Sequence, residues 1–402
     1  MPIAENNEFL VKEQVDYKCS SYRKPPFYKL RGIYYRKFTE KYGEIQMKKQ
    51  KVRGKERSQT TSRKQSHVEL VVSKQVSHLS ISSGFDTLRF VHNAVPEIAL
   101  GDVDTSTEFL GKHLEVPILI SSMTGGYDDA ERINGALAAL STKYGTAMGI
   151  GSERQALENK RYHASFKIVR KENPKGLIFS NIGAVEVARL MREKKTGQIK
   201  KLIDLIEADG LIIHLNPLQE LMQPEGMPDF RGVLSGIEHC VKSLGVPVIA
   251  KEVGAGISKE AAKKLLEAGV RIIDVAGAGG TSWAGVEILR QKKKVRARLE
   301  PFWDWGITTV DALMQVRELR ETMTFGIIAS GGIRSGIDIA KSLALGADLC
   351  GIAKPLISSF MSGGEKALHR TMDDLVIQLR YTMFLTGSQN LDGLAKQPLQ
   401  RI

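Results

Sequence analysis

Four polar side chains follow a single apolar run within seven residues: His214, Asn216, Gln219 and Glu220. The run before them, 210–213 (Gly-Leu-Ile-Ile), predicts a buried strand. His214 and Asn216 are two residues apart, so on a strand they would share one face. Pro217 cannot continue a central strand and predicts a turn. The stretch could bring an imidazole, two amides and a carboxylate together for acid–base chemistry or binding; a polar loop that caps a strand is the alternative.

Eight short apolar runs recur from residue 117 onward and lack the alternation of a half-exposed strand. Such runs are typical of parallel strands buried on both faces. Amphipathic helical patterns separate most of them, and the pattern at 259–268 is followed by Gly269, a common residue after a helix end. Eight strand–helix units predict an α/β fold, a (βα)8 TIM barrel over residues 58–402; a doubly wound sheet is the alternative. The runs are 117–120, 147–150, 177–180, 210–213, 247–250, 271–275, 326–329 and 348–352.

The active site of such a barrel lies at the carboxyl ends of the strands. Glycines or chemically useful side chains follow all eight runs. After the last two runs the chain offers Gly331 and Gly332 with Arg334, and then Ala353 with Lys354. Backbone N–H groups at this place in a barrel commonly hold a phosphate group. We therefore predict a phosphate site there; two tight turns without a ligand are the alternative.

Other strand ends suit a flat heterocycle. Lys251 ends a buried run and needs an anionic partner. The pyrimidine edge of a reduced flavin is one candidate, and a salt bridge to Glu252 or another carboxylate is the other. Thr124, Asn181 and Thr281 could hydrogen-bond to the heterocycle; capping of helices or turns is their alternative role.

Two further groups suit a phosphorylated substrate. Arg63, Lys64 and His67 form a compact cationic cluster that could hold a phosphate or diphosphate. Glu220 could bind Mg²⁺ together with substrate phosphates, because Mg²⁺ favours one or two carboxylates plus phosphate oxygens. The alternatives are a solvated basic surface and a surface carboxylate.

The basic charge of the chain is concentrated at its N-terminus. The net charge is +13, but residues 1–66 hold 17 Lys and Arg against 7 Asp and Glu, whereas the other 336 residues hold 41 against 38. Residues 1–57, a basic N-terminal extension, mix aromatic and basic side chains without a regular period. The extension could stack on nucleic acid, dock on a partner or not fold at all. We do not expect the whole protein to bind nucleic acid.

Hydropathy and cysteine usage predict a cytoplasmic protein. No run of eighteen apolar residues is present, so we expect no membrane span. The N-terminal residues lack the pattern of a signal peptide. Cys19, Cys240 and Cys350 are scattered, which fits a reducing compartment rather than a disulfide framework.

Together these motifs resemble those of the type 2 isopentenyl-diphosphate isomerase family, over residues from about 60 to 395. Two elements separate this family from other FMN barrels: His-Leu-Asn-Pro-x-Gln-Glu at 214–220 and Arg-Lys at 63–64. The other matching motifs are Ser-Met-Thr-Gly-Gly at 122–126, Gly-Ser at 151–152 with Arg154, Asn-Ile-Gly at 181–183, Lys-Glu at 251–252, Gly-Gly-Thr at 279–281, Asp-Trp-Gly at 304–306 and Ser-Gly-Gly-Ile-Arg-Ser-Gly at 330–336.

The resemblance implies an isomerase of isoprenoid biosynthesis that interconverts isopentenyl and dimethylallyl diphosphate. It also implies reduced FMN, NADPH as the reductant, Mg²⁺, and a homo-oligomer, either a tetramer or an octamer. Glu220 would be the metal ligand, and His214, Asn216 and Gln219 would position the substrate for catalysis. The substrate would be bound by Arg63, Lys64, His67, Ser152, Arg154 and Gln219. FMN would be bound by Ser122, Met123, Thr124, Ser152, Asn181, Lys251, Thr281, Gly331, Gly332, Arg334, Ala353 and Lys354.

The implied reaction adds a proton to the alkene terminus and removes another from the neighbouring carbon, without net redox change. Because no ordinary side chain protonates an alkene easily, the reduced flavin is the expected acid and base. An FMN-dependent oxidoreductase of the same barrel type is the alternative. Glu153 departs from the family pattern, which has Gln there; we expect its side chain to point away from the phosphate groups.

Overall fold

The computed structural model describes residues 59–73 and 76–402, which belong to the unit Arg57–Ile402. The predicted basic extension, 1–57, lies outside the described residues, so its role and its boundary with the barrel domain stay predictions. Within the described residues, none of the helices combines the length and the apolar character needed to cross a lipid bilayer.

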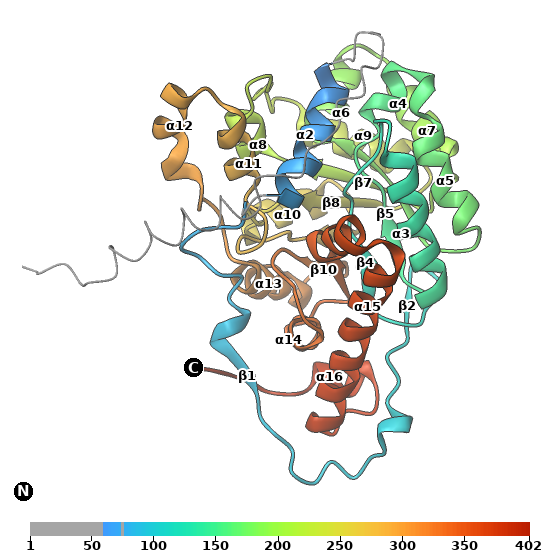
Figure 1. The fold of residues 1–402 in the computed structure, drawn as a ribbon, viewed down its shortest axis with the longest axis vertical. Coiled ribbons are helices and arrows are strands. Elements are labelled where there is room, and N and C mark those ends of the chain that lie inside the picture. Colours follow the sequence, from blue (N-terminus) through green and yellow to red (C-terminus); the bar gives the residue numbers. More distant parts are fainter. Residues whose placement is uncertain (1–58, 74–75) are drawn as a thin grey trace, which may run out of the picture. The chain divides into compact units, whose positions relative to one another are not determined.

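The eight predicted strands form one closed barrel of parallel strands (Figure 1). The last strand pairs with the first, with Cys350 opposite Ile118, which closes the sheet. Nearly every strand residue is buried, because side chains on one face fill the barrel and those on the other pack under helices. The strands are β4 Ile118–Ile120, β5 Ala147–Gly149, β6 Ile178–Gly183, β7 Gly210–Leu215, β8 Val248–Glu252, β9 Ile272–Asp274, β10 Gly326–Ser330 and β11 Leu349–Ile352.

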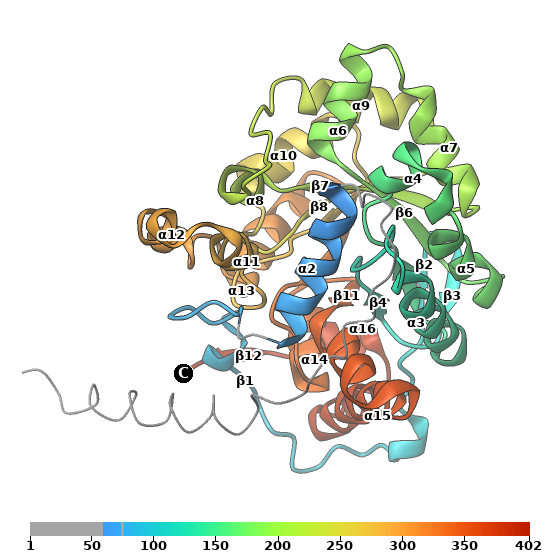
Figure 2. The same cartoon turned by 45° about the horizontal axis from the view of Figure 1, so that its top comes forward.

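Helices follow every barrel strand and cover the outside of the barrel (Figures 1 and 2). In α10, the Ser258 hydroxyl accepts a hydrogen bond from Ala261 N at 3.2 Å, and Gly269 follows the helix at φ +90°, as its predicted position requires. Helix α15 is broken at Gly363 and Gly364. The helices are α2 Gln59–Ser73, α3 Ala130–Tyr144, α4 Arg154–Glu158, α5 Ala164–Glu172, α6 Ala184–Arg192, α7 Gly197–Leu205, α8 Pro217–Met222, α9 Val233–Ser243, α10 Lys259–Glu267, α11 Trp283–Arg290, α12 Lys293–Leu299, α13 Thr309–Arg317, α14 Gly336–Ala344, α15 Lys354–Thr386 and α16 Leu391–Ala395. Shorter 3₁₀ turns span Phe85–Thr87, Leu100–Asp102, Lys160–Tyr162, Glu300–Phe302 and Glu318–Glu321.

A small hairpin closes the barrel at the amino-terminal ends of its strands. Its strands, β2 (Thr107–Phe109) and β3 (Lys112–Leu114), pair antiparallel. Phe109 and Leu114 pack in one cluster with inward-facing strand residues such as Leu119. Because this end is filled by side chains, a ligand cavity can open only at the carboxyl ends of the strands.

The chain that leads into the barrel is fixed along the rim and by a second strand pair. The segment before β1 (Leu88–Phe90) passes Asp304, whose carboxylate accepts hydrogen bonds from the backbone N–H groups of residues 79 and 80, both at 2.7 Å. Strand β1 then pairs antiparallel with β12 (Leu399–Arg401). The Asp-Trp-Gly motif at 304–306 therefore has a structural role in holding this segment.

Two helices carry rim residues that the sequence singled out. The turn predicted at Pro217 is wrong: Pro217 is the first residue of α8, a position that suits proline because the N–H group there has no partner within the helix. The other helix, α2, contains the cationic cluster and crosses the barrel opening in Figure 2. It packs against α11 and α15.

Candidate active site

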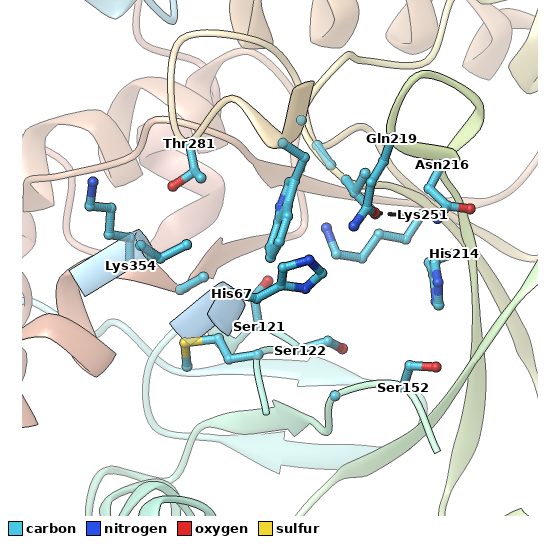
Figure 3. Close-up of a pocket in the computed structure, with 18 of the residues that line it drawn as sticks. His67, Ser121, Ser122, Ser152, His214, Asn216, Gln219, Lys251, Thr281 and Lys354 are labelled. Carbon is cyan, nitrogen blue, oxygen red and sulfur yellow. Dashed lines mark hydrogen bonds between the residues drawn. The ribbon is translucent and has the colours of Figure 1, made fainter. Parts of the chain in front are cut away.

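A cavity of about 600 Å³ opens at the carboxyl ends of the strands, and α2 forms part of its wall (Figure 3). All eight strand ends contribute residues to it. The side chain of Arg63 lies outside the described part of the chain. Every other site residue predicted from the sequence lines the cavity: Lys64, His67, Ser122, Met123, Thr124, Ser152, Arg154, Asn181, His214, Asn216, Gln219, Glu220, Lys251, Thr281, Gly331, Gly332, Arg334, Ala353 and Lys354.

One corner of the cavity suits a phosphate group. Lys354 begins α15 and faces the cavity together with Arg334. Burial and repulsion by Arg334 lower the pKa of Lys354, so an anion placed between the two cations would stabilise both charges. Gly332 has φ +72°, and a Cβ there would lie 2.7 Å from Ser83 Cβ, so the loop accepts only glycine without movement.

The side of the cavity next to that corner has unused hydrogen-bonding capacity. Ser121 Oγ and Ser122 Oγ are buried and have no hydrogen-bond partner among the described residues. Thr281 does not cap α11, because Ser282 Oγ accepts the capping hydrogen bond from Gly285 N at 2.9 Å. Buried polar atoms without partners indicate a missing polar ligand. The donors and acceptors here fit the flavin ring, and the adjacent cations fit its phosphate.

Lys251 forms a salt bridge within the protein, which was the alternative to a contact with a flavin. Its side chain also lines the cavity. Its Nζ lies 3.4 Å from Asp274 Oδ2 and donates to Ser330 Oγ at 3.3 Å. Glu252 is not its counter-ion, because that carboxylate accepts hydrogen bonds from the backbone N–H groups of residues 253–255. Burial raises the pKa of Glu252 to about 7 despite these bonds. Lys251 is therefore paired on one side and open to a ligand on the other.

Helix α2 attaches its cationic residues to the barrel rim. Lys64 Nζ donates to the carbonyl oxygens of Gly125 and Ser152 at 2.7 and 2.6 Å. His67 Nε2 lies 2.8 Å from Glu287 Oε1, and the His67 ring packs edge-on against Trp283. These contacts place both basic groups at the cavity, where they could meet an anionic substrate.

Glu287 is a site residue that sequence reasoning missed. Its Oε1 also accepts a hydrogen bond from Gln219 Nε2 at 3.1 Å, and its Oε2 pairs with Arg290 at 2.5 Å. Burial alone would raise the pKa of Glu287, but the hydrogen bonds and charges of His67 and Arg290 outweigh burial and lower it. The available signal was a lone carboxylate in the apolar stretch 283–289, but its partners lie far away in the sequence.

Side chains of the stretch 214–220 make two sets of hydrogen bonds at the cavity wall. His214 Nδ1 bonds to Asn181 Oδ1 at 2.7 Å. Asn216 Nδ2 donates to Glu220 Oε1 at 3.2 Å, and Met227 N donates to Glu220 Oε2 at 2.9 Å. These bonds orient the Glu220 carboxylate without neutralising its charge.

The described residues contain no group of three His, Cys, Asp or Glu side chains that could enclose a metal ion. Glu220 lines the cavity, and among the described residues its carboxylate accepts hydrogen bonds from neutral donors, Asn216 Nδ2 and Met227 N. Such a group fits Mg²⁺ when substrate phosphates and water complete the coordination.

Glu153 is fully buried and does not line the cavity; that its side chain points away from the phosphate groups stays a prediction. Its Oε2 accepts hydrogen bonds from Ser180 Oγ and Asn181 N, while Oε1 has no hydrogen-bond partner among the described residues. Burial raises the pKa of Glu153 to about 8, although both hydrogen bonds and the charge of Lys64 act in the opposite direction. A pKa raised in this way favours the protonated, neutral carboxyl group, which resembles the glutamine of the family pattern.

Comparison with known proteins agrees with this geometry. Residues 224–401 match the family model of FMN-dependent dehydrogenases. Among solved structures, a Pediococcus acidilactici protein described as a lactate oxidase shares the fold, with 16% identity, a TM-score of 0.60, and coverage of 85% of this chain and 94% of that chain.

Curated relatives are much closer in sequence. The isopentenyl-diphosphate delta-isomerase of Chlorobium phaeovibrioides is 46% identical over 344 residues, which is 83% of this chain and 95% of the relative. That of Chlorobium limicola is 46% identical over 350 residues, 85% of this chain and 96% of the relative. The chain belongs to the isopentenyl-diphosphate delta-isomerase family, in its flavin-dependent type 2 branch.

Proposed function

We propose that the chain interconverts isopentenyl and dimethylallyl diphosphate with FMN bound in the barrel mouth. One observation carries the proposal: a single cavity has two separate basic regions. Arg334 and Lys354 face it from the ends of β10 and β11, and Lys64 and His67 face it from α2. Figure 3 shows Lys354 at one side of the cavity and His67 between it and the opposite wall. One basic region suits a cofactor phosphate and the other a substrate diphosphate.

The side chains hold the substrate rather than transfer its protons. Lys64 and His67, with Arg63, Ser152 and Arg154, bind the diphosphate. His214, Asn216 and Gln219 fix the position of the isoprenyl group. Gln219 is itself oriented by Glu287, whose Oε1 accepts its amide hydrogen at 3.1 Å. Positioning of this kind lowers the barrier because the reacting groups need no further ordering.

Reduced FMN, when bound, supplies an electron-rich ring that can give and accept a proton and stabilise positive charge. Ser122, Met123, Thr124, Ser152, Asn181, Thr281 and Lys251 hold its ring and ribityl chain, and Gly331, Gly332, Arg334, Ala353 and Lys354 hold its phosphate. Glu220 binds Mg²⁺ jointly with the diphosphate. Trp283, beside His67, helps to exclude water from the alkene.

Further features are proposed from the family resemblance. NADPH supplies the electrons that reduce FMN before turnover. The protein acts in the cytoplasm as a homo-oligomer, a tetramer or an octamer. Sedimentation or light scattering of the purified FMN-bound protein tests the last of these, and a monomer contradicts it.

An FMN-dependent oxidoreductase is the competing function, because such enzymes use the same kind of barrel and phosphate site. It would not require the Gln219–Glu287–His67 network described above. The two functions differ in their use of reductant: the oxidoreductase consumes one equivalent per turnover, whereas the isomerase needs reduction only once.

The test is isomerisation in heavy water. The FMN-loaded protein is reduced without oxygen and incubated with isopentenyl diphosphate and Mg²⁺ in D₂O. We expect dimethylallyl diphosphate that carries deuterium, many turnovers per reduced flavin, and none when the same sample is kept oxidised. No product and no deuterium incorporation would refute the isomerase function.

A further inference from the structure

Three polar residues on neighbouring strands form a cluster at the upper end of the barrel interior. Lys251 on β8 and Asp274 on β9 are register partners, and their charged atoms lie 3.4 Å apart. Ser330 on β10 donates to Asp274 Oδ1 at 2.5 Å and accepts from Lys251 Nζ at 3.3 Å. The cluster therefore contains one cation, one anion and one hydroxyl that bridges them.

Only part of this cluster reaches the cavity. Lys251 and Ser330 line it, whereas Asp274 is fully buried and lies behind them. On the other side of Lys251, its register partner is His214, which is bonded to Asn181. Asp274 therefore makes no direct contact with the cavity, and it can influence a ligand there through Lys251 and Ser330 and through the field of its charge.

The burial of the Asp274 carboxylate in the barrel interior needs an explanation. Burial of a charge is costly even when the charge is paired, and a pair of apolar residues of similar volume would serve the fold as well or better. The apolar side chains that fill the lower part of the barrel interior, such as those of Leu119, Ile212 and Ile328, show that apolar residues fit inside this barrel. The cluster is better explained by the ligand that Lys251 faces.

We propose that Asp274 is a positioning residue that offsets the charge of Lys251, so that the bound reduced flavin keeps its N1 proton. The inference rests on the proposed function, in which Lys251 faces the pyrimidine edge of FMN. A lone cation at that edge would favour loss of the N1 proton and an anionic ring. The Asp274 carboxylate behind the cation opposes this, which leaves a neutral reduced ring that still carries the proton needed for acid–base work.

The test uses the FMN-loaded protein without substrate and measures two properties of the flavin. The first is the two-electron midpoint potential, and the second is the near-ultraviolet spectrum of the reduced form across pH, which distinguishes neutral from anionic flavin. In Asp274→Asn the amide still accepts from Ser330, but Lys251 loses its counter-charge. We expect a more positive potential, by about 30 mV for each tenfold gain in relative affinity for reduced FMN, and an anionic spectrum at lower pH than in the wild type.

Two further variants complete a double-mutant cycle. Lys251→Gln should shift the potential in the negative direction, and the double variant, which pairs two neutral amides, should lie close to the wild type. If Asp274→Asn alone does not fold, the double variant can still be compared with Lys251→Gln, because it leaves no unpaired charge. Asp209→Asn is the matched control, since it removes a carboxylate paired with Lys112 at the opposite end of the barrel.

The outcomes separate this inference from the proposed function. FMN binding with the same potential and spectrum in Asp274→Asn as in the wild type overturns the inference alone. A double variant whose potential stays as far from the wild type as Lys251→Gln also overturns it. Failure of the wild-type protein to bind FMN refutes the proposed function and the inference with it.

Discussion

The buried carboxyl of Glu153 makes the stability of the protein depend on pH. Burial raises its pKa from 4.5 to about 8. Its Oε1 atom has no hydrogen-bond partner within the described part of the chain. Between these two pH values the folded state holds a proton that the unfolded state releases. The contribution of Glu153 to stability therefore falls as the pH rises from about 4.5 and becomes constant above about 8.

The substitution Glu153→Gln removes this titration while keeping the shape of the side chain and an acceptor for Asn181 N. One pH unit of unequal proton binding corresponds to about 1.36 kcal/mol, so the wild type should lose about 2 kcal/mol relative to the variant between pH 6 and pH 8. Any constant cost of the buried amide shifts both ends equally and leaves the difference unchanged.

The assay is urea unfolding of both proteins, saturated with FMN, at pH 6, 7 and 8. Glu131→Gln, at an exposed position in the first turn of α3, is the matched control and should follow the wild type at every pH. A free-energy difference between Glu153→Gln and the wild type that does not change with pH would refute the reasoning, because Glu153 would then be ionised in the folded protein.

Other predictions concern the ligand sites. Glu220→Gln removes a charged ligand worth roughly 1.5–3 kcal/mol, so half-maximal activity should need at least about tenfold more Mg²⁺ while FMN absorbance is retained; equal loss of both would contradict the assignment. Lys354→Gln should weaken FMN binding about 10- to 100-fold in a fluorescence titration, whereas the exposed Lys366→Gln should not, and equal affinities would exclude a phosphate at Lys354. Gly332→Ala forces a side chain into a left-handed backbone and should cost roughly 1–3 kcal/mol, seen as a lower melting temperature; an unchanged temperature would contradict this.

The barrel could be predicted because its strands are buried on both faces. A continuous apolar run is the pattern that such burial selects, and all eight runs became strands. Helix α2 was harder, because its sequence combines a cationic cluster with an apolar run and shows no strong helical period. Its position at the barrel mouth depends on contacts with α11 and α15, which lie far away in the sequence.

Some residues of the candidate site could likewise be predicted from the sequence, and others could not. Residues placed by their strand ends, such as Lys251 and His214, could be located from the fold class alone. The partners Asp274 and Glu287 could not, because a register between strands or a contact across the rim decides them. Asp274 lies within the otherwise largely apolar run 271–275, and a carboxylate in such a run is the sequence feature that indicates a buried polar partner.

The barrel can close between β11 and β4 only after β11, which lies late in the chain, has been synthesised. The edge of β4 has no strand partner until Leu349–Ile352 has been made, and the edge of β10 waits for the same segment. During translation a nascent chain that ends before β11 thus exposes two open, apolar sheet edges, which are templates for pairing with other chains. We expect the need for chaperones to be greatest in that interval, and truncations just before β11 to aggregate rather than form a smaller soluble barrel.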